Sequence, residues 1–131
     1  MIRPQYHGRH TQQGFLVWDV RRLLTLVKSL PVIEMPLSQI AELDENYWYQ
    51  TDDMVPTGRS IADHMQLVNE SSLEYPILLC SEGRLMDGMH RVIKAHLSGH
   101  DTIRAIRFER TPKSFSWLLI YPRHWVPKSP E

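Results

Sequence analysis

The stretch of sequence that decides the fold is residues 84–95, which read RLMDGMHRVIKA. Its first three residues are expected to form a strand that pairs back as a hairpin on a buried, apolar strand at residues 76–80. The tight turn between the two strands contains Gly83, a residue type that adopts positive φ without strain. Asp87-Gly88 then opens a helix. The sequence therefore predicts a hairpin that leads directly into a helix.

The helix expected after Gly88 has its apolar residues at the spacing of a single helical face. The members of this stripe are Met89, Val92, Ile93, His96 and Leu97. Gly99 follows, where glycine commonly ends a helix. A histidine on an apolar face is most often a hydrogen-bonded core residue, so we expect His96 to be buried and not to bind a metal.

Three elements are expected before residue 44. A helix over residues 16–30 is predicted from helical spacing and is ended by Pro31. The apolar residues that share this spacing are Leu16, Val20, Leu23, Val27 and Leu30. A short strand at residues 32–35 follows, and then a helical turn capped by Ser38.

After an irregular segment at residues 44–59, a second helix is expected to follow Ser60, and a last strand spans residues 102–108. The apolar residues expected to face inward from that helix are Ile61, Met65, Leu67 and Val68. Together these elements predict one small α+β domain over residues 1–131, with a mixed β-sheet and packed helices. Its core would cover residues 31–108 and its tail residues 109–131, where the apolar run 115–121 is expected to pack on the body.

Composition limits the class of protein. The 131 residues are enough for one domain with a real core. Hydrophobic residues make up 42% and charged residues 23%, which is typical of globular chains. Cys80 is the only cysteine, so an intramolecular disulfide is excluded, and in its apolar strand we expect it to be inert. No apolar run reaches the roughly 18 residues of a membrane span, and the N-terminus does not resemble a signal peptide. We therefore expect a cytoplasmic protein with no membrane partner.

The charges balance overall but not along the chain. Lys plus Arg and Asp plus Glu each number 15, which does not favour a protein that coats nucleic acid. Residues 1–83 contain 6 basic and 11 acidic residues, whereas residues 84–131 contain 9 basic and 4 acidic residues. This asymmetry suits a local anion site in the second part of the chain. The alternative is a bipolar surface with no partner.

The predicted start of the helix at residue 88 is the best candidate for chemistry. Helix N-termini bind anions through unpaired N–H groups and the helix dipole. His90, Arg91 and Lys94 add positive charge there, although cations at this end of a helix oppose the dipole. A bound phosphate would make that arrangement favourable. Gly88 would let a ligand approach the backbone closely.

Each of these residues also has a simpler interpretation. Asp87 is a helix N-cap by residue type, which we favour, or else a ligand of Mg²⁺ or a base beside a phosphate. His90 is a phosphate donor or acid–base group, or else a solvated histidine in the first helical turn. Arg91 binds phosphate, or it forms an i, i+4 ion pair with Asp87.

The order of these motifs resembles the ParB/sulfiredoxin superfamily over about residues 31–108. Domains of that family carry a phosphate-binding Gly-x-x-Arg turn at a strand–helix junction, which reads Gly88-Met89-His90-Arg91 here. Residues 32–40 are also similar to the opening strand and turn of the family, and residues 60–72 to the helix that precedes its Pro-Ile strand. The resemblance implies a phosphate-binding α+β fold.

Members of the superfamily differ in chemistry. ParB domains bind and hydrolyse CTP, sulfiredoxins use ATP, and a free serine kinase carries an Asp-Gly-His-His-Arg form of the turn, close to residues 87–91 here. Met89 replaces the catalytic cysteine of sulfiredoxin, so that reductase activity is not expected. Lys94 stands where ParB has alanine, and Arg59 is the nearest substitute for ParB's second phosphate-binding box. Too few residues follow Phe108 for ParB's helix-turn-helix, so we expect a stand-alone domain.

The resemblance implies a nucleotide-binding domain, either a phosphotransferase or an NTPase, that takes a nucleoside triphosphate with Mg²⁺. The phosphate-binding residues would be Gly88, Met89, His90, Arg91, Lys94 and Arg59. Asp87 and His90 would be catalytic, and Asp87 would hold Mg²⁺. On this interpretation Arg91→Ala weakens nucleotide binding and leaves the fold intact, whereas an Asp87–Arg91 ion pair predicts unfolding.

The sequence contains three further candidate features and is compatible with two alternative functions. The aromatic residues 47–49 (YWY) are expected either to stack on a base or to pack in the core. Asp52 and Asp53 are expected either to hold Mg²⁺ or to be solvated. His64 is expected to face the same cleft as Arg59. A nuclease or nucleic-acid-binding module would use the basic residues Arg104, Arg107, Arg110 and Lys113. A non-catalytic interaction module would show an exposed apolar patch.

Overall fold

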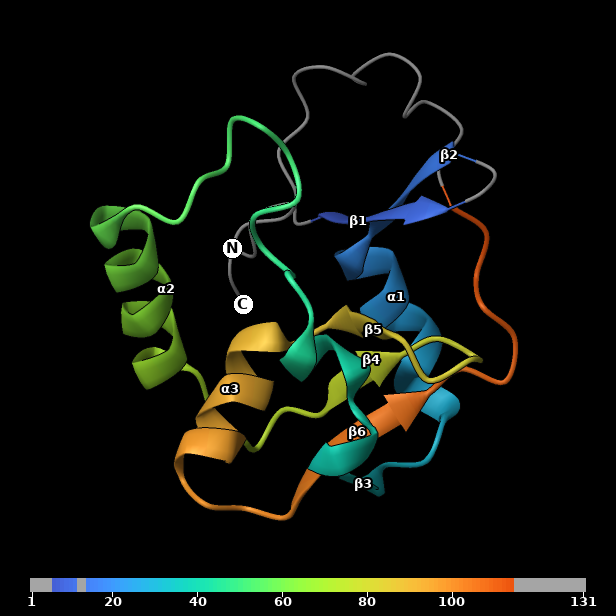
Figure 1. Cartoon of the computed structure of the whole chain (residues 1–131). Coiled ribbons are helices and arrows are strands. Elements are labelled where there is room, and N and C mark those ends of the chain that lie inside the picture. Colours follow the sequence, from blue (N-terminus) through green and yellow to red (C-terminus); the bar gives the residue numbers. More distant parts are fainter. Residues whose placement is uncertain (1–5, 12–13, 115–131) are drawn as a thin grey trace.

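The protein is described by a computed structural model, in which residues 6–11 and 14–114 are placed. Its centre is a four-stranded sheet in the order β3-β6-β4-β5 (Figure 1). The strands are β3 (Ile33–Pro36), β4 (Ile77–Leu79), β5 (Leu85–Asp87) and β6 (Thr102–Arg107). β4 and β6 are parallel, whereas β3–β6 and β4–β5 are antiparallel. The prediction of an α+β fold with a small mixed sheet is therefore confirmed.

The two faces of the sheet are covered by different helices (Figure 1). Helix α3 (Met89–Leu97) packs on one face, where Ile77 and Leu79 of β4 join its buried residues Met89 and Val92. Helix α1 (Val20–Leu26) covers the other face, where Leu78 lies in a second apolar cluster. The alternation along β4 follows from the two-residue period of a strand. Because both of its faces are buried, β4 is apolar throughout.

The N-terminal region differs from the predicted helix over residues 16–30. The chain forms a two-stranded hairpin, β1 (Tyr6–Thr11) and β2 (Gly14–Asp19), before α1 begins. The Asp19 side chain accepts a hydrogen bond from the Arg21 N–H at 3.0 Å and so caps the helix at residue 20. A 3-10 turn at Val27–Ser29 replaces the last predicted turns. Leu16 fits both a helical and a strand spacing, which is why its periodicity was misleading.

The segment between β3 and β4 contains two 3-10 turns, a long connection and a helix. The turns are at Leu37–Gln39 and Ala41–Asp44, where one helical turn was predicted. The helix is α2 (Gly58–Glu70), whose N-cap is Thr57 and not Ser60, because the Thr57 Oγ1 accepts from the Ser60 N–H at 3.1 Å.

Helix α2 lies outside α3, on the side of α3 away from the sheet (Figure 1). The prediction that Ile61 and Met65 face the core is wrong, since they are 47% and 37% exposed, and only Val68 is fully buried. A helix in this outer layer buries only a narrow face, because it packs against another helix and not against the sheet. Apolar spacing alone does not reveal how many layers lie beneath a helix.

The predicted stripe of α3 is also only partly correct. Met89 and Val92 are buried, but His96 and Leu97 are exposed. Ala95 and the charged residue Arg91 occupy buried positions instead. The buried face of α3 is therefore rotated relative to the predicted apolar stripe. The reason is that Arg91, paired with Asp87, takes up a buried position.

Side chains cover the outer edge of β5. The Leu85 N–H donates to the Glu42 Oε2 at 2.9 Å, and the Leu85 carbonyl accepts from the Arg9 Nη2 at 3.3 Å. Beyond β6, the Pro112 carbonyl accepts from the Trp18 Nε1 at 2.7 Å, so the chain after the sheet returns to the N-terminal hairpin. The apolar run predicted to pack at residues 115–121 lies outside the described residues. Within the described part of the chain, no helix is long and apolar enough to span a membrane.

We predict that Gly88→Ala destabilises the protein strongly. A Cβ at residue 88 would lie 2.5 Å from the Ile77 Cγ2, and φ at this residue is +114°. Strain and overpacking together are expected to lower the free energy of unfolding by about 3 kcal/mol, measured by urea denaturation. Gly99→Ala is the matched control, because Gly99 has φ of +79° but no atom within 4 Å of the added Cβ. Equal losses for both variants would contradict the role of the close approach to Ile77.

Candidate functional site

The predicted phosphate turn connects β5 to α3. Asp87 is the last residue of β5, and Gly88, with positive φ, is the N-cap residue of α3. The space that a Cβ would take at Gly88 is occupied by Ile77, so the glycine serves the close packing of β4 against this turn. Met89 is 4% exposed and lies in the core. These two residues therefore have structural roles in the turn.

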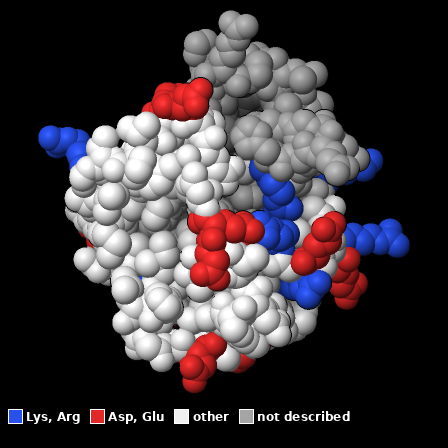
Figure 2. Space-filling view, viewed as in Figure 1, with Lys and Arg blue, Asp and Glu red and all other residues white. Residues whose placement is uncertain are grey.

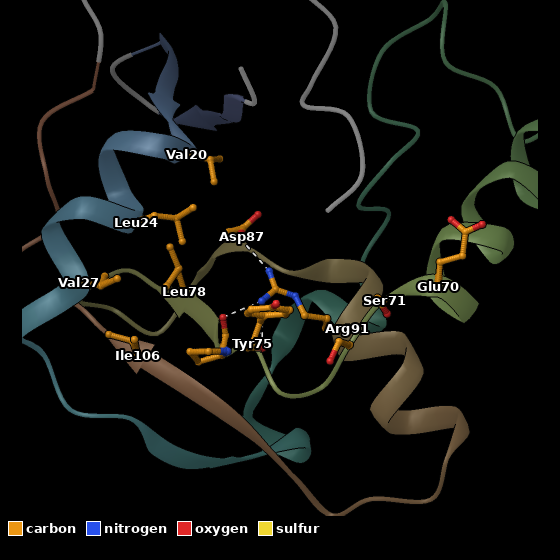
Figure 3. Close-up of a pocket in the computed structure, with 12 residues that line it drawn as sticks. Val20, Leu24, Val27, Glu70, Ser71, Tyr75, Leu78, Asp87, Arg91 and Ile106 are labelled. Atoms are coloured by element: carbon orange, nitrogen blue, oxygen red, sulfur yellow. Dashed lines mark hydrogen bonds and ion pairs between the residues drawn. The ribbon is translucent and has the colours of Figure 1, made fainter. Parts of the chain in front are cut away.

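Asp87 and Arg91 form a buried ion pair (Figure 3). The Arg91 Nη2 lies 2.8 Å from the Asp87 Oδ2, and the two residues are 6% and 4% exposed. The Arg91 Nη1 also donates to the carbonyls of Tyr75 and Pro76, at 3.0 and 2.8 Å. The ion-pair alternative is therefore confirmed, and the guanidinium holds protein groups on two sides. The N-cap residue of α3 is Gly88, so the cap predicted at Asp87 is one residue too early in the sequence.

Lys94 has a similar structural role. Its Nζ donates to the carbonyl of Asn69 at 2.9 Å and to that of Ser71. These carbonyls belong to the C-terminal end of α2, where unsatisfied carbonyls and the negative end of the helix dipole favour a cation. Lys94 and Arg91 were predicted to present their charges to one ligand. In the structure each contacts main-chain carbonyls, and the two do not converge on a common space.

His90 is buried, with 1% of its surface exposed, so the alternative of a solvated histidine is wrong. Its Nε2 lies 2.9 Å from the Nδ1 of His64, and the two rings share a hydrogen bond between α3 and α2. The Trp48 ring stacks on both, with centroid distances of 3.7 Å to His64 and 5.0 Å to His90. Tyr49 meets His64 edge-on at 6.1 Å. Trp48 therefore packs on the imidazoles and with the core cluster of α3.

A polar hollow of about 410 Å³ lies beside this histidine pair on α2. Its lining residues are Thr57, Arg59, Ser60, Asp63, His64 and Leu67. The expectation that His64 and Arg59 face the same cleft is therefore confirmed. His64 is half-buried and lines the hollow while it contacts His90 behind it. Through His64, the first turn of α3 is connected to a space lined by one positive side chain, Arg59, and one negative side chain, Asp63.

The predicted Mg²⁺ ligand does not fit well where it was placed. The Oδ2 of Asp87 is already bonded to a guanidinium, and Mg²⁺ requires several oxygen ligands in octahedral geometry. Among the described residues, no group of three or more His, Cys, Asp and Glu side chains is placed to hold a metal ion. Asp52 and Asp53 are exposed on the long connection. The Asp87 Oδ2 therefore serves the ion pair with Arg91.

The basic residues of the nucleic-acid alternative make contacts within the protein. Arg104 donates to the Glu74 carbonyl at 3.2 Å, and Arg107 donates to that of Ser81. β6 ends at Arg107, so Arg110 does not continue the strand face that Arg104 occupies. On the face seen in Figure 2, positive and negative side chains are interspersed, and the described residues there form no continuous basic surface.

Cys80 is buried, as predicted, with 1% of its surface exposed. Burial raises the pKa of its thiol, whereas hydrogen bonds with the backbone of Glu82 and Arg84 and with the Arg9 side chain lower it. The balance leaves the pKa of Cys80 below its ordinary value. The Arg9 Nη1 lies 3.6 Å from the sulfur. Because the thiol is enclosed by the apolar cluster, Cys80 is a structural residue.

Sequence reasoning missed the contact between His64 and His90. The two residues are 26 positions apart, and nothing in the local pattern of α2 marks residue 64 as buried against another helix. Their residue type was the available signal, since both are histidines in helices predicted to lie beside one turn. Comparisons with protein-family models, with curated proteins and with solved structures find no match for this chain.

We predict that Arg91→Ala destabilises the fold. The substitution leaves the Asp87 carboxylate buried without its cation, and breaking such a pair typically costs about 3–5 kcal/mol in the free energy of unfolding. Urea denaturation measures this loss. The matched control is Arg21→Ala, which removes an exposed pair with Asp19 at 3.7 Å and should cost less than about 1 kcal/mol.

The double variant Asp87→Leu/Arg91→Met removes both charges. It is expected to recover part of the stability lost by Arg91→Ala, because no unpaired charge remains in the core. An Arg91→Ala protein that unfolds at the same urea concentration as the wild type would show that the ion pair does not stabilise the turn.

Proposed function

We propose that this chain is a nucleotide-binding domain of the ParB/sulfiredoxin type, whose ligand is a nucleoside triphosphate bound in the hollow of α2 beside the first turn of α3. The observation that carries the proposal is the His64–His90 hydrogen bond, which joins the helix start predicted to bind phosphate to a hollow that contains Arg59. Phosphate oxygens are well matched to imidazole and guanidinium donors.

The order of elements supports the fold part of this proposal. A strand, a helix, a hairpin, a helix and a last strand follow one another as β3, α2, β4–β5, α3 and β6. This is the order on which the resemblance rests, and the glycine of the Gly-x-x-Arg motif stands at the N-cap of α3 with φ of +114°.

Two motif residues that the resemblance assigned to phosphate binding contact the protein's own carbonyl groups instead. Arg91 and Lys94 are positioning residues, because they hold the carbonyls that lead into β4 and end α2. On this proposal the phosphate is bound by Arg59 and His64, which both line the hollow. His90 contacts His64 from behind, and the hydrogen bond between the two imidazoles holds the His64 ring in position.

Such a pair suits acid–base work on a phosphate ester or anhydride. In hydrolysis of the terminal anhydride, a water oxygen bonds to the γ-phosphorus while the bond from that phosphorus to the bridging oxygen breaks. His64 would accept the proton that the water loses, and the released nucleoside diphosphate carries away the bridging oxygen. In transfer to an acceptor, a hydroxyl group replaces the water, and His64 takes its proton instead. Arg59 would stabilise the charge on the transferred group.

The proposal is tested by measuring ligand-induced stabilisation. We predict that one of ATP, CTP, GTP and UTP, each with Mg²⁺, raises the Tm of the wild-type protein, because a ligand that binds only the folded state stabilises it. Arg59→Ala and His64→Gln should weaken the Kd of that nucleotide, measured by calorimetry, about tenfold or more, since hydrogen bonds to charged groups contribute about 1.5–3 kcal/mol. Phosphate release should fall in His64→Gln.

Arg22→Ala is the matched control for Arg59→Ala, because Arg22 is an exposed arginine that lines a different part of the surface, beside residues 108–113. Its nucleotide affinity should equal that of the wild type. The proposal is wrong if none of the four nucleotides shifts the Tm, or if Arg59→Ala binds nucleotide as tightly as Arg22→Ala.

A further inference from the structure

A second cavity, of about 480 Å³, lies beneath α1 (Figure 3). Its apolar wall is made by α1 and the sheet, with Val20, Leu24 and Val27 on one side and Leu78 and Ile106 on the other. The segment from the end of α2 to β4 closes the remaining side. A space of this size, with an apolar lining and a few polar groups, has the character of a small-molecule site.

The polar residues that line this cavity include the buried Asp87–Arg91 pair (Figure 3). Arg91 is only 6% exposed, and within the described part of the chain its Nε has no hydrogen-bond partner. A buried N–H without an acceptor is energetically unfavourable. A ligand that supplies an acceptor would therefore gain binding free energy. The cavity beneath α1 is a separate space from the hollow of α2, because the two share no lining residue.

The charges around the cavity indicate what kind of acceptor fits. Asp87 already neutralises Arg91, and Glu70 adds a second carboxylate to the lining. An anionic ligand would place another negative charge near these carboxylates, which is unfavourable in a low-dielectric site. A cationic ligand would lack an acceptor for the Arg91 Nε. A neutral carbonyl oxygen meets the hydrogen-bonding requirement without adding charge.

From this geometry we propose that the cavity beneath α1 is a binding site for an uncharged, mainly apolar small molecule that carries a carbonyl group. The apolar part lies between α1 and the sheet, and the carbonyl oxygen accepts from Arg91. The site is separate from the nucleotide hollow, so the proposal does not depend on nucleotide binding.

The test uses three probes with the same eight-carbon chain and different heads: octanamide, octanoate and octylammonium. Each is titrated into the full-length, isotope-labelled protein, and backbone amide shifts are followed by NMR. Octanamide should shift the amides of Leu24 and Leu78 and bind about tenfold more tightly than either charged probe. The proposal is overturned if no probe shifts these amides, or if a charged probe binds as tightly as octanamide.

A pair of variants on α1 locates the site. Leu24 is 41% exposed and lines the cavity, whereas Leu26 is 43% exposed and lines a different one. Leu24→Trp should fill the cavity and reduce octanamide affinity at least tenfold, and Leu26→Trp should leave it unchanged. Because both positions are exposed, both variants are expected to fold, which the Tm verifies. Equal octanamide affinity in the two variants would overturn the proposal, and the probe series in the wild type tests it without any substitution.

Discussion

The Arg91 guanidinium holds together three parts of the chain that apolar packing alone would not fix relative to one another. It pairs with the end of β5, it extends from the first turn of α3, and it binds the carbonyls of Tyr75 and Pro76 just before β4. These two hydrogen bonds tie the residues that lead into β4 to the first turn of α3. The single cation thereby sets the position at which β4 enters the sheet beside the hairpin.

Helix α2 depends on a different kind of contact. It lies on α3 and not on the sheet, and few of its apolar side chains are buried. Lys94 holds its C-terminal carbonyls, and His90 holds its middle through His64. Polar contacts of this kind are directional, so they fix the rotation of α2 about its own axis more closely than a smooth apolar face would. The hollow that contains Arg59 is lined by this same helix and by Thr57, its N-cap residue.

The parts of the fold that could be predicted from the sequence are those specified by local chemistry. The hairpin at Gly83, the start of α3 after Gly88 and the buried strand β4 follow from turn residues and from runs of apolar residues. Residues 16–19 of β2 were predicted as the start of a helix, because Leu16 continues the spacing of the helix that follows it. In α3 the predicted stripe put His96 and Leu97 inside, since periodicity counts apolar residues and does not foresee a buried arginine.

The sequence identified the residues of the candidate site but not the contacts that most of them make. The ion pair of Asp87 and Arg91 could be foreseen from their spacing of four residues, because it is local. The contacts of Lys94 with Asn69, and of His90 with His64, join residues on two helices that lie 25 and 26 positions apart, and no local pattern encodes them. The cavity beneath α1 was likewise unforeseen, because the residues that line it belong to segments whose relative placement only the folded chain shows.

The side chains at Leu85 have a consequence for how the protein behaves in concentrated solution. Among the described strands β5 lies at an edge of the sheet, and an open edge can recruit a strand from another molecule and start aggregation. Here the outward N–H and carbonyl of Leu85 are already bonded to Glu42 and Arg9. A second chain could extend the sheet at this edge only by displacing a buried carboxylate and a half-buried guanidinium. The two side chains therefore oppose the addition of a foreign strand at Leu85, because each occupies a backbone group that such a strand would need.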